Sequence, residues 1–523
     1  MTCPVRTLIA LTVLTALAAA GCTSTSGQGS YSNSIGRSGT PSPTATPATP
    51  TVDEVSFTDC TNVIEPQLTG QAGATRDLRF GCGRLSVPLD YTKPDGTHIT
   101  LFLLRVRLSG QQHRIGSLVV NPGGPGGSGV DTAVGLGLVL SVDLLRRFDI
   151  VGFDPRGVGL SNPLKCIPAA LKDQATALDP DARTAAEYQA QVAVARSAAT
   201  DCTRKYGSSL SHYNTEETAR DMDLIRQAVG DPELTYLGFS YGTRIGSVYA
   251  TLFPKRVRAM VLDGAVDPVA GEVASAETQA KGFENAYSQF AAACAARPSC
   301  PLGRDPRAFL TALITSARAA PIRSSKHGET RRATAGYVLL AAISALYQQS
   351  EWSDLETALA DAKRGDAIGV FRLADEYSQR DDKGSYTNLL DANITINCTD
   401  SSERISDGQI HQSLSAWRTR YPLFGTSLAL GLLGCAEWTA PQHPIPAVRS
   451  AGSAPILVVG TRNDPATPYA SAQVLTRQLG SARLLTWNGQ GHTAYPKTTC
   501  VTTAVNTYLV TRQLPAVGKV CPR

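Results

Sequence analysis

The sequence predicts an α/β fold: a mostly parallel sheet with helices on both faces and an inserted helical cap. Two observations support this prediction. Short apolar runs recur along the chain, as is typical of parallel strands that are covered on both faces. An alanine-rich block of helical patterns then interrupts them between about residues 271 and 440. The apolar runs are Ser117–Asn121, Phe148–Phe153, Leu234–Phe239, Val257–Asp263, Pro455–Gly460 and Arg483–Trp487.

The order of the elements supports an open sheet. Residues 84–89 and 98–107 alternate apolar and polar side chains, as strands of an opening antiparallel meander do. Between two of the apolar runs, residues 218–230 have a helical period, and Thr218 with Asp221 fits a capping box at its start. Strand, helix and strand in succession indicate an α/β sheet.

The block between residues 271 and 440 contains helical patterns at residues 272–296, 305–319, 334–347 and 353–363. We interpret it as a cap inserted into the sheet domain, because strand patterns resume after it. A separate second domain is the alternative. The expected organisation is a signal peptide (1–21), a disordered tether (22–55), the first part of the core (56–270), the cap (271–440) and the second part of the core (441–523).

The composition excludes several classes of protein. Hydrophobic residues make up 42% of the 523 residues and charged residues 18%, which is a globular balance. With 49 basic and 44 acidic residues, the net charge of +5 is too small to indicate a nucleic-acid-binding protein. No basic amphipathic run indicates a helix that lies on a membrane surface.

The N-terminus resembles an export leader. One positive charge, at Arg6, precedes an apolar run over residues 8–20, which is too short to span a bilayer. Small residues directly before Cys22 resemble a bacterial lipobox, in which this cysteine is lipidated. Cleavage with release is the alternative. The Ser-, Thr- and Pro-rich residues that follow predict an extended tether between a membrane anchor and the folded part.

Ten cysteines are left after Cys3 in the leader and Cys22 are set aside. An even number in an exported chain suggests disulfides. No Cys-x-x-Cys or paired Cys/His spacing indicates a metal site. Sequence cannot determine the connectivity, and pairing near neighbours is the simplest option: Cys60/Cys82, Cys166/Cys202, Cys294/Cys300, Cys398/Cys435 and Cys500/Cys521.

A candidate nucleophile follows the strand predicted at Leu234–Phe239. Gly238, Ser240 and Gly242 form a Gly-x-Ser-x-Gly pattern between this strand and a predicted helix. The pattern alone is weak, but its position is that of a nucleophile elbow, where the strained turn leaves no room for side chains two residues on either side of the serine. A buried serine in an ordinary turn is the alternative.

A serine nucleophile needs a base, and the base needs a carboxylate that orients it. Asp464 follows the strand predicted at residues 455–460, and His492 follows the strand predicted at residues 483–487. The order serine, acid, histidine is that of α/β-hydrolases. Asp464 could instead be a turn residue before Pro465.

The strand predicted at residues 117–121 runs into a glycine-rich loop. Glycines let backbone N–H groups approach a developing oxyanion. We expect the backbone N–H groups of Gly124 and Tyr241 to form an oxyanion hole. The loop also matches the Gly-x-Gly-x-x-Gly pattern of dinucleotide sites, but Pro125 removes an amide from that pattern, and dinucleotides are scarce outside the cell.

Together these segments resemble the α/β-hydrolase serine peptidases of the prolyl and tripeptidyl aminopeptidase group. The nearest resemblance is to exported actinobacterial lipoprotein members with a helical cap, which also include carboxylesterases. The resemblance extends from about residue 60 to the C-terminus. Its segments are Asn121–Gly127, Val151–Gly159, Gly238–Gly242, Arg256–Pro268, Ile396–Asp400 and Asp464–Pro468.

The resemblance implies cleavage of peptides from a free N-terminus, with an acid near the cap binding the substrate ammonium group. Asp400 is the first candidate for that acid and Glu437 the second, and the alternative is that Asp400 caps a helix or turn. We therefore expect an exported serine hydrolase that needs no metal or cofactor. A carboxylesterase acting on small esters or lipids and a catalytically idle binding protein are the alternatives. The sequence does not indicate the oligomeric state.

Overall fold

A computed structural model describes residues 52–523, except residues 69, 75 and 403. The expected signal peptide, Cys22 and the tether up to residue 51 lie outside the described residues. Val55, which the sequence places in the tether, is buried, and its backbone N–H donates to the carbonyl of Ala228 at 2.7 Å. The chain therefore already packs against the core at Val55.

The ten strands of the described chain form one sheet in the order β1-β2-β3-β5-β4-β6-β7-β8-β9-β10. The pairings from β1 to β5 are antiparallel, and those from β5 to β10 are parallel. This confirms the mostly parallel sheet with an antiparallel opening. The strands are β1 (Thr58–Asp59), β2 (Leu78–Pro88), β3 (His98–Leu108), β4 (Gly116–Asn121), β5 (Phe148–Phe153), β6 (Leu234–Phe239), β7 (Val257–Asp263), β8 (Ile456–Asn463), β9 (Ala482–Gln490) and β10 (Val520–Cys521).

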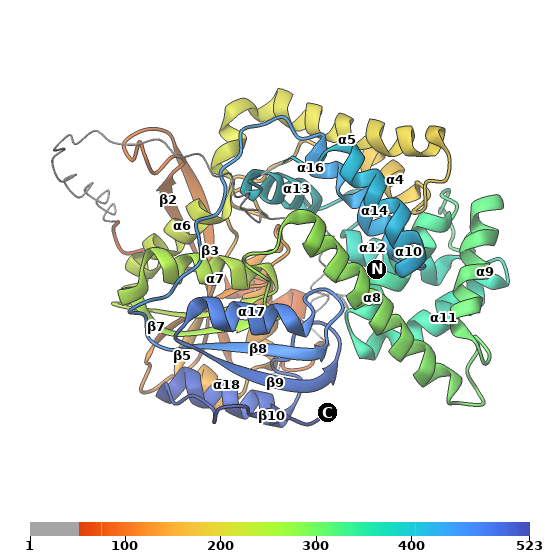
Figure 1. The fold of residues 1–523 in the computed structure, drawn as a ribbon. Helices are drawn as coiled ribbons and strands as arrows, with labels where there is room; N and C mark the ends of the chain where they lie inside the picture. Colours follow the sequence, from red (N-terminus) through yellow and green to blue (C-terminus); the bar gives the residue numbers. More distant parts are fainter. Residues whose placement is uncertain (1–51, 69, 75, 403) are drawn as a thin grey trace, which may run out of the picture.

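Helices cover both faces of the sheet (Figure 1). Side chains alternate between the faces, so Val119 of β4 joins one apolar cluster while Leu118 and Val120 join the other. One face is covered by α6 (Thr215–Ala228), α7 (Tyr241–Leu252) and α17 (Tyr469–Leu479). The other is covered by α2 (Gly129–Val139), α3 (Val142–Leu145) and α18 (Thr499–Thr511).

Helix α6 begins earlier than the sequence analysis predicted. Its N-cap is Asn214, whose side chain accepts a hydrogen bond from the backbone N–H of Glu217 at 2.8 Å. Thr218, the predicted cap, lies inside the helix and donates its hydroxyl to the carbonyl of Asn214. The predicted capping box is therefore wrong, because Asn214 is an equally good cap one turn earlier.

A helical layer lies beside the sheet (Figure 1). Its apolar cluster includes side chains from Ala182, Tyr188 and Val192, which belong to the segment around α5. The cap as we propose it therefore also includes α4 and α5, together with the helices between residues 272 and 436. These helices are α4 (Ala169–Ala177), α5 (Ala185–Tyr206), α8 (Glu272–Ala295), α9 (Pro306–Ala319), α10 (Ala335–Leu346), α11 (Trp352–Lys363), α12 (Ile368–Ser378), α13 (Leu389–Asp400), α14 (Asp407–Arg420), α15 (Gly425–Gly431) and α16 (Leu433–Ala436).

Short turns complete the chain. They are α1 (Thr61–Ile64) and the 3₁₀ helices η1 (Glu65–Leu68), η2 (Gly207–His212), η3 (Pro254–Arg256) and η4 (Gln349–Glu351).

Helix α13 connects the cap to the loops of the core. The side chain of Asn388 donates to the carbonyl of Gly157 at 2.7 Å and accepts from the N–H of Gly159 at 2.9 Å. One turn further on, the Asn393 amide donates to the carbonyl of Pro125 at 2.9 Å. These bonds place the cap directly over the glycine-rich loop.

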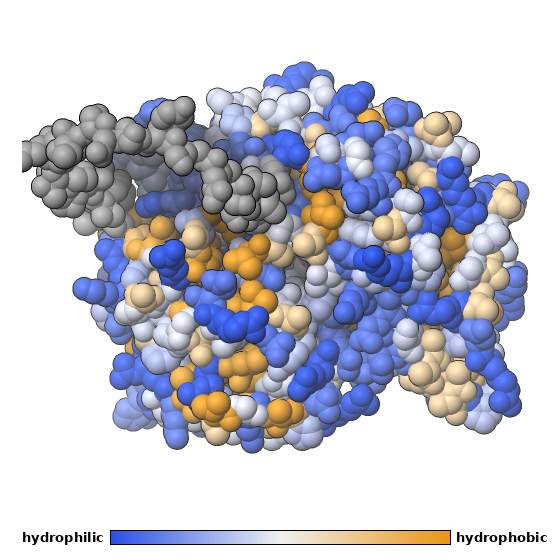
Figure 2. Space-filling view, in the orientation of Figure 1, coloured by the Kyte–Doolittle hydropathy of each residue, from blue (hydrophilic) through white to orange (hydrophobic). Residues whose placement is uncertain are grey.

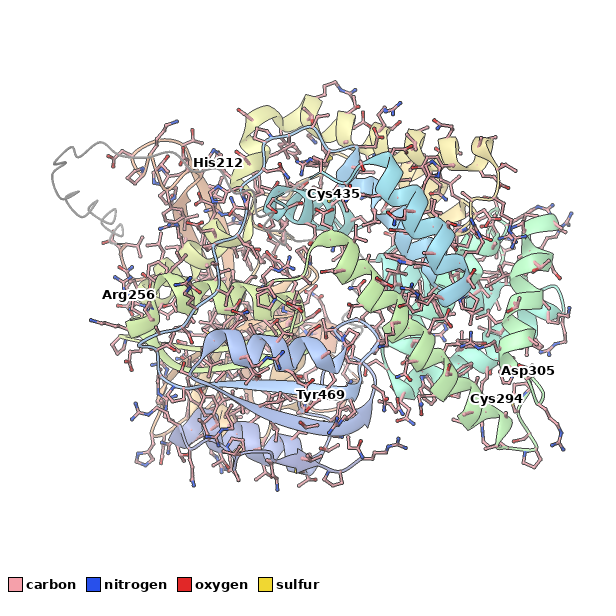
Figure 3. The ribbon with its side chains drawn as sticks, viewed as in Figure 1. His212, Arg256, Cys294, Asp305, Cys435 and Tyr469 are labelled. Carbon is pink, nitrogen blue, oxygen red and sulfur yellow. A yellow bond between two sulfur atoms is a disulfide. The ribbon has the colours of Figure 1, made fainter. Side chains whose placement is uncertain are left out.

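Five disulfides join the described cysteines in the near-neighbour pairing, which confirms that option. Cys294 at the C-terminal end of α8 is bonded to Cys300 in the turn that follows (Figure 3). Cys435 on α16 is bonded to Cys398 on α13, so this disulfide joins two helices of the cap. The bonds are Cys60–Cys82, Cys166–Cys202, Cys294–Cys300, Cys398–Cys435 and Cys500–Cys521.

Hydrophilic residues cover much of the face shown in Figure 2, and apolar residues form separate patches there. Within the described part of the chain, no helix combines the length and apolar character needed to cross a membrane.

Candidate active site

Ser240 lies at the turn between β6 and α7 with φ 54° and ψ −123°, a left-handed backbone conformation that L-residues rarely adopt. A Cβ at Gly238 would lie 2.5 Å from the carbonyl oxygen of Gly242, and one at Gly242 would lie 2.8 Å from that of Asn121. Both glycines are therefore required for this turn. The Ser240 N–H donates to the carbonyl of Asp263 at 2.9 Å, so the turn is tied to the end of β7.

Asp464 and His492 follow the neighbouring strands β8 and β9, and the structure brings them together. His492 Nδ1 lies 2.9 Å and 3.0 Å from the two carboxylate oxygens of Asp464. An ionised carboxylate only accepts, so Nδ1 carries the proton and Nε2 has the free lone pair. Nε2 is buried and has no hydrogen-bond partner among the described residues, so it is available as a base.

The histidine ring also lies against the strand end that bonds Ser240. A Cβ at Gly264, the residue after Asp263, would lie 3.2 Å from Cε1 of His492. Parallel strands end at one edge of a sheet, and for this reason side chains after β6, β7, β8 and β9 meet there.

Thr467 contacts both members of the pair, and sequence reasoning assigned it no role. Its hydroxyl lies 3.2 Å from Asp464 Oδ2 and 3.3 Å from His492 Nδ1, and its backbone N–H donates to Asp464 Oδ1 at 2.8 Å. The available signal was its place in the segment Asp464–Pro468, three residues after the acid.

Asp263 at the end of β7 is a second buried carboxylate that sequence reasoning did not single out. It accepts hydrogen bonds from the backbone N–H groups of Ala494 and Tyr495, and burial raises its pKa to about 6. Lys497 donates to the carbonyl of His492 at 2.6 Å, and burial lowers the pKa of its ammonium group to about 8. These bonds hold the loop that carries His492.

The glycine-rich loop after β4 packs directly on the elbow. A Cβ at Gly123 would lie 2.8 Å from the Tyr241 nitrogen and 2.9 Å from Ser240 Cβ, so the backbone of the loop touches the serine. The backbone N–H groups of Gly124 and Tyr241 donate to no group of the described residues. Both are therefore available to an oxyanion.

The cap covers this edge of the sheet. The His492 ring packs edge-on against the ring of Tyr347, with the ring centres 5.3 Å apart. The backbone N–H of His492 donates to the Tyr347 carbonyl at 2.8 Å. A Cβ at Gly126 would lie 2.6 Å from the carbonyl oxygen of Leu389 on α13. Helix α13 thus covers the loop where a dinucleotide would need to approach, which argues against that alternative. Ser240 is 3% exposed and His492 1%.

The two acids proposed for the substrate ammonium group are engaged elsewhere. Asp400 is fully buried, and its oxygens accept from the backbone N–H and the hydroxyl of Thr215 at 2.8 Å and 2.5 Å. It therefore binds the first residue of α6, whose N-cap is Asn214, and burial raises the pKa of Asp400 to about 6. Glu437 accepts from Arg196 on α5 at 2.9 Å and 3.4 Å. We carry neither residue forward as an ammonium site.

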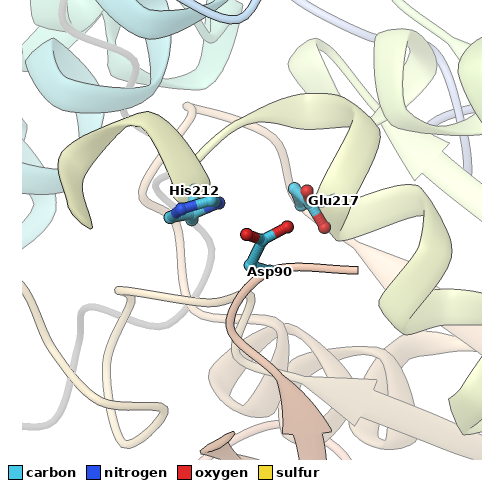
Figure 4. Close-up of side chains that lie close together, drawn as sticks. All are labelled: Asp90, His212 and Glu217. Atoms are coloured by element: carbon cyan, nitrogen blue, oxygen red, sulfur yellow. The ribbon is translucent and has the colours of Figure 1, made fainter. Parts of the chain in front are cut away.

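Another group of ligand-type side chains does not include the serine, acid or histidine described above. Atoms of Asp90, His212 and Glu217 are within 4.8 Å of one another (Figure 4). Arg156 Nη1 lies 3.7 Å from Glu217, while its other nitrogens bond Asp221 at 2.7 Å and 2.8 Å. Because this buried guanidinium already places a positive charge beside Glu217, we do not assign a metal to the group.

A serine on a strand-to-helix elbow, a buried Asp–His pair after the following strands and a glycine-rich loop are features of serine hydrolases built on an α/β sheet. The comparisons with known proteins agree. The chain belongs to the alpha/beta hydrolase fold family, whose profile matches residues 116–497, and it is a serine hydrolase. This confirms the resemblance described above.

Three relatives span most of the chain. Serine protease Hip1 of Mycobacterium tuberculosis is 38% identical over an alignment of 487 positions that covers 89% of this chain and 91% of the relative. Carboxylesterase B of the same species is 38% identical over an alignment of 467 positions that covers 86% of this chain and 87% of the relative. Tripeptidyl aminopeptidase of Streptomyces lividans is 32% identical over an alignment of 449 positions that covers 84% of this chain and 83% of the relative.

Proposed function

We propose that Ser240 is the nucleophile, His492 the general base and Asp464 the acid that orients it. The support is geometric: Asp464 holds His492 Nδ1 at 2.9 Å, while Nε2 has no partner among the described residues. The backbone N–H groups of Gly124 and Tyr241 would stabilise the tetrahedral intermediate.

In this reaction the Oγ–H proton of Ser240 moves to Nε2 of His492 as Oγ bonds the carbonyl carbon. The imidazolium then returns its proton to the leaving amine or alcohol, the bond to the leaving group breaks, and an acyl-enzyme remains. In the second half of the reaction, water gives a proton to Nε2 of His492 and attacks the acyl carbon. The bond to Ser240 Oγ then breaks, Oγ takes the proton back from His492, and the acid is released.

We infer further that the chain is an exopeptidase that cleaves from a free N-terminus, of the tripeptidyl or prolyl aminopeptidase type. The observation that supports this is the burial of Ser240 and His492, with Tyr347 of the cap packed on the His492 ring. Such a buried nucleophile favours a narrow substrate such as a chain end over a folded protein. Two of the three relatives described above are named as peptidases. A carboxylesterase is the second candidate, supported by the relative of that name.

We also propose that the protein is exported and anchored through a lipid on Cys22. Five disulfides support an oxidising compartment. Membrane fractionation of cells that express the Cys22→Ala chain tests the anchor, because the variant should leave the membrane fraction. If the variant stays there in the same amount, the anchor does not depend on Cys22.

Three substrates test the activity: a tripeptide anilide with a free amine, the same anilide N-blocked, and a short-chain nitrophenyl ester. Turnover of the free anilide but not of the blocked one is the expected result, and Ser240→Ala should abolish it. Turnover of the ester alone would contradict the peptidase assignment and favour the esterase. Undiminished turnover by Ser240→Ala would contradict the assignment of the nucleophile.

A further inference from the structure

The cap contains a partly enclosed cavity of about 300 Å³ between helices α4, α5, α10, α13, α15 and α16. This volume is at the lower end of the range for small-molecule sites. We call it the cap cavity. Aliphatic side chains make up most of its wall, and none of the described residues that line it is aromatic. The wall includes Leu171, Val194, Leu339, Ile343, Leu390 and Leu430.

Four polar side chains of the wall, those of Lys172, Thr176, Gln191 and Asn393, already have hydrogen-bond partners. Lys172, the one charged residue among the described residues of the wall, is bonded to Asp391 at 2.5 Å, and Gln191 donates to the carbonyl of Asp179 at 2.8 Å. The amide nitrogen of Asn393 donates to the carbonyl of Pro125. An occupant of the cap cavity would therefore be held mainly by apolar contact. A wall without rings favours a flexible aliphatic chain, because an aromatic group gains from ring partners.

One residue links the cap cavity to the reaction site. Asn393 lines the cavity and holds Pro125 at 2.9 Å, next to Gly124, whose N–H we assign to the oxyanion hole. Gly123, two residues before Pro125, packs against Ser240 Cβ. The cap cavity and the loop on which the reacting carbonyl would lie are therefore both in contact with one residue, Asn393 on α13.

We propose that the cap cavity binds an aliphatic group on the acyl side of the scissile bond. The group could be the acyl chain of an ester or the aliphatic side chain of an N-terminal residue, since both present the same surface. The inference rests on Ser240 as the nucleophile and adds a substrate preference for long, unbranched aliphatic groups.

Gly431 at the end of α15 provides the test. It lines the cap cavity, and a Cβ built there meets no atom within 4 Å, so a larger side chain can fill space without a clash. Gly408 on α14 is a matched control, because it is also a helical glycine with open space but is exposed and outside the cavity. Ala195→Leu, from the wall on α5, is a second filling variant.

Two substrate series are measured with the full chain and the variants: nitrophenyl esters from acetyl to octanoyl, and aminoacyl anilides from alanyl to 2-aminooctanoyl. In the unaltered protein, kcat/KM should rise at least tenfold with chain length in one or both series, which identifies the source of the group. Gly431→Leu should lower the ratio of long-chain to short-chain kcat/KM at least tenfold, and Gly408→Leu should leave it unchanged. An unchanged ratio in both filling variants, or an equal change in Gly408→Leu, would overturn the proposal.

Binding without turnover separates this inference from the proposed function. Decanoate should raise the melting temperature of Ser240→Ala protein, and adding Gly431→Leu should remove that rise. If the rise is present but no ester or anilide is hydrolysed, the cap cavity binds an aliphatic chain and the proposed function is wrong. If decanoate binds equally with and without Gly431→Leu, the assignment of the cavity is wrong.

Discussion

At the scale of single residues, the site depends on a tight turn at Ser240 that requires glycine at two neighbouring positions. Ser240 adopts φ 54° because Gly238 and Gly242 make room for the turn and because its N–H is held by the carbonyl of Asp263. Behind it, Asp464 receives His492 Nδ1 together with the backbone N–H groups of Ala466 and Thr467. The carboxylate is therefore fixed before any substrate arrives.

Asp464→Asn should lower kcat by about 10³- to 10⁴-fold with little change in the melting temperature. The amide has nearly the same shape as the carboxylate, but it no longer holds the proton on Nδ1 or stabilises the imidazolium. Steady-state kinetics on the preferred substrate, with a thermal melt of the same sample, measure both effects.

Asp305→Asn is the control for this change. Asp305 caps α9 by accepting from the N–H of Ala308, and asparagine caps a helix equally well, so kcat should stay as in the unaltered protein. A loss of less than tenfold for Asp464→Asn would argue against its role as the orienting acid.

At the scale of the elements, α13 holds the cap to the core. Besides Asn388 and Asn393, it carries Asp391, whose Oδ1 accepts from the backbone N–H groups of Cys166 and Ile167 at 2.7 Å. The other oxygen bonds the buried ammonium group of Lys172. One face of a single helix therefore orders the segment before α4 and borders the cap cavity.

Asp391→Ala should destabilise the protein by about 3–5 kcal/mol, because it leaves the buried charge of Lys172 without a partner. Chemical unfolding followed by circular dichroism measures the change. The matched control is Asp382→Ala, which removes the partner of Lys326 at an exposed ion pair and should change stability by less than about 1 kcal/mol. Equal effects of the two variants would contradict the role given to α13.

At the scale of the whole molecule, several carboxylates are buried inside the fold. Burial raises the pKa of Asp154, Asp263 and Asp400 to about 6 in each case. A raised carboxyl pKa means that the folded state keeps a proton that the unfolded state has lost. The stability contributed by such a group is complete below its ordinary pKa near 4 and is lost as pH rises through about 6.

Asp400→Asn tests this at one junction, between α13 and α6. The free energy of unfolding of the unaltered protein, relative to that of the variant, should fall by about 1–3 kcal/mol as pH rises from 4 to 7, because asparagine does not titrate. Urea unfolding at several pH values measures the difference. A difference that does not change with pH, or that grows, would show that Asp400 is ionised at low cost in the folded state.

Glu216 should behave in the opposite way. Its hydrogen bond with His443 lowers the pKa of its carboxyl to about 2. The stability that Glu216 contributes is therefore present above its ordinary pKa and is lost as pH falls toward 2. The free energy of unfolding of the unaltered protein, relative to that of Glu216→Gln, should therefore fall as pH is lowered from 5 to 3.

Much of the fold could be predicted from sequence because its information is local. Buried parallel strands are continuous apolar runs, and the runs predicted at Phe148–Phe153, Leu234–Phe239 and Val257–Asp263 coincide with β5, β6 and β7. The glycines around Ser240 and the positions of Asp464 and His492 after late strands follow from the same local patterns. The disulfides are also local, because each joins cysteines that follow one another along the chain.

The tertiary structure alone decided what depends on contacts between distant segments. The sequence did not show that α4 and α5 join the cap, that Thr467 reaches His492, or that Asp263 holds the loop after β9. It offered Asp400 as a ligand for substrate, whereas the fold buries this carboxylate against Thr215, 185 residues earlier in the chain. Burial and hydrogen-bond partners are set by packing between layers, and no periodicity within a single element records them.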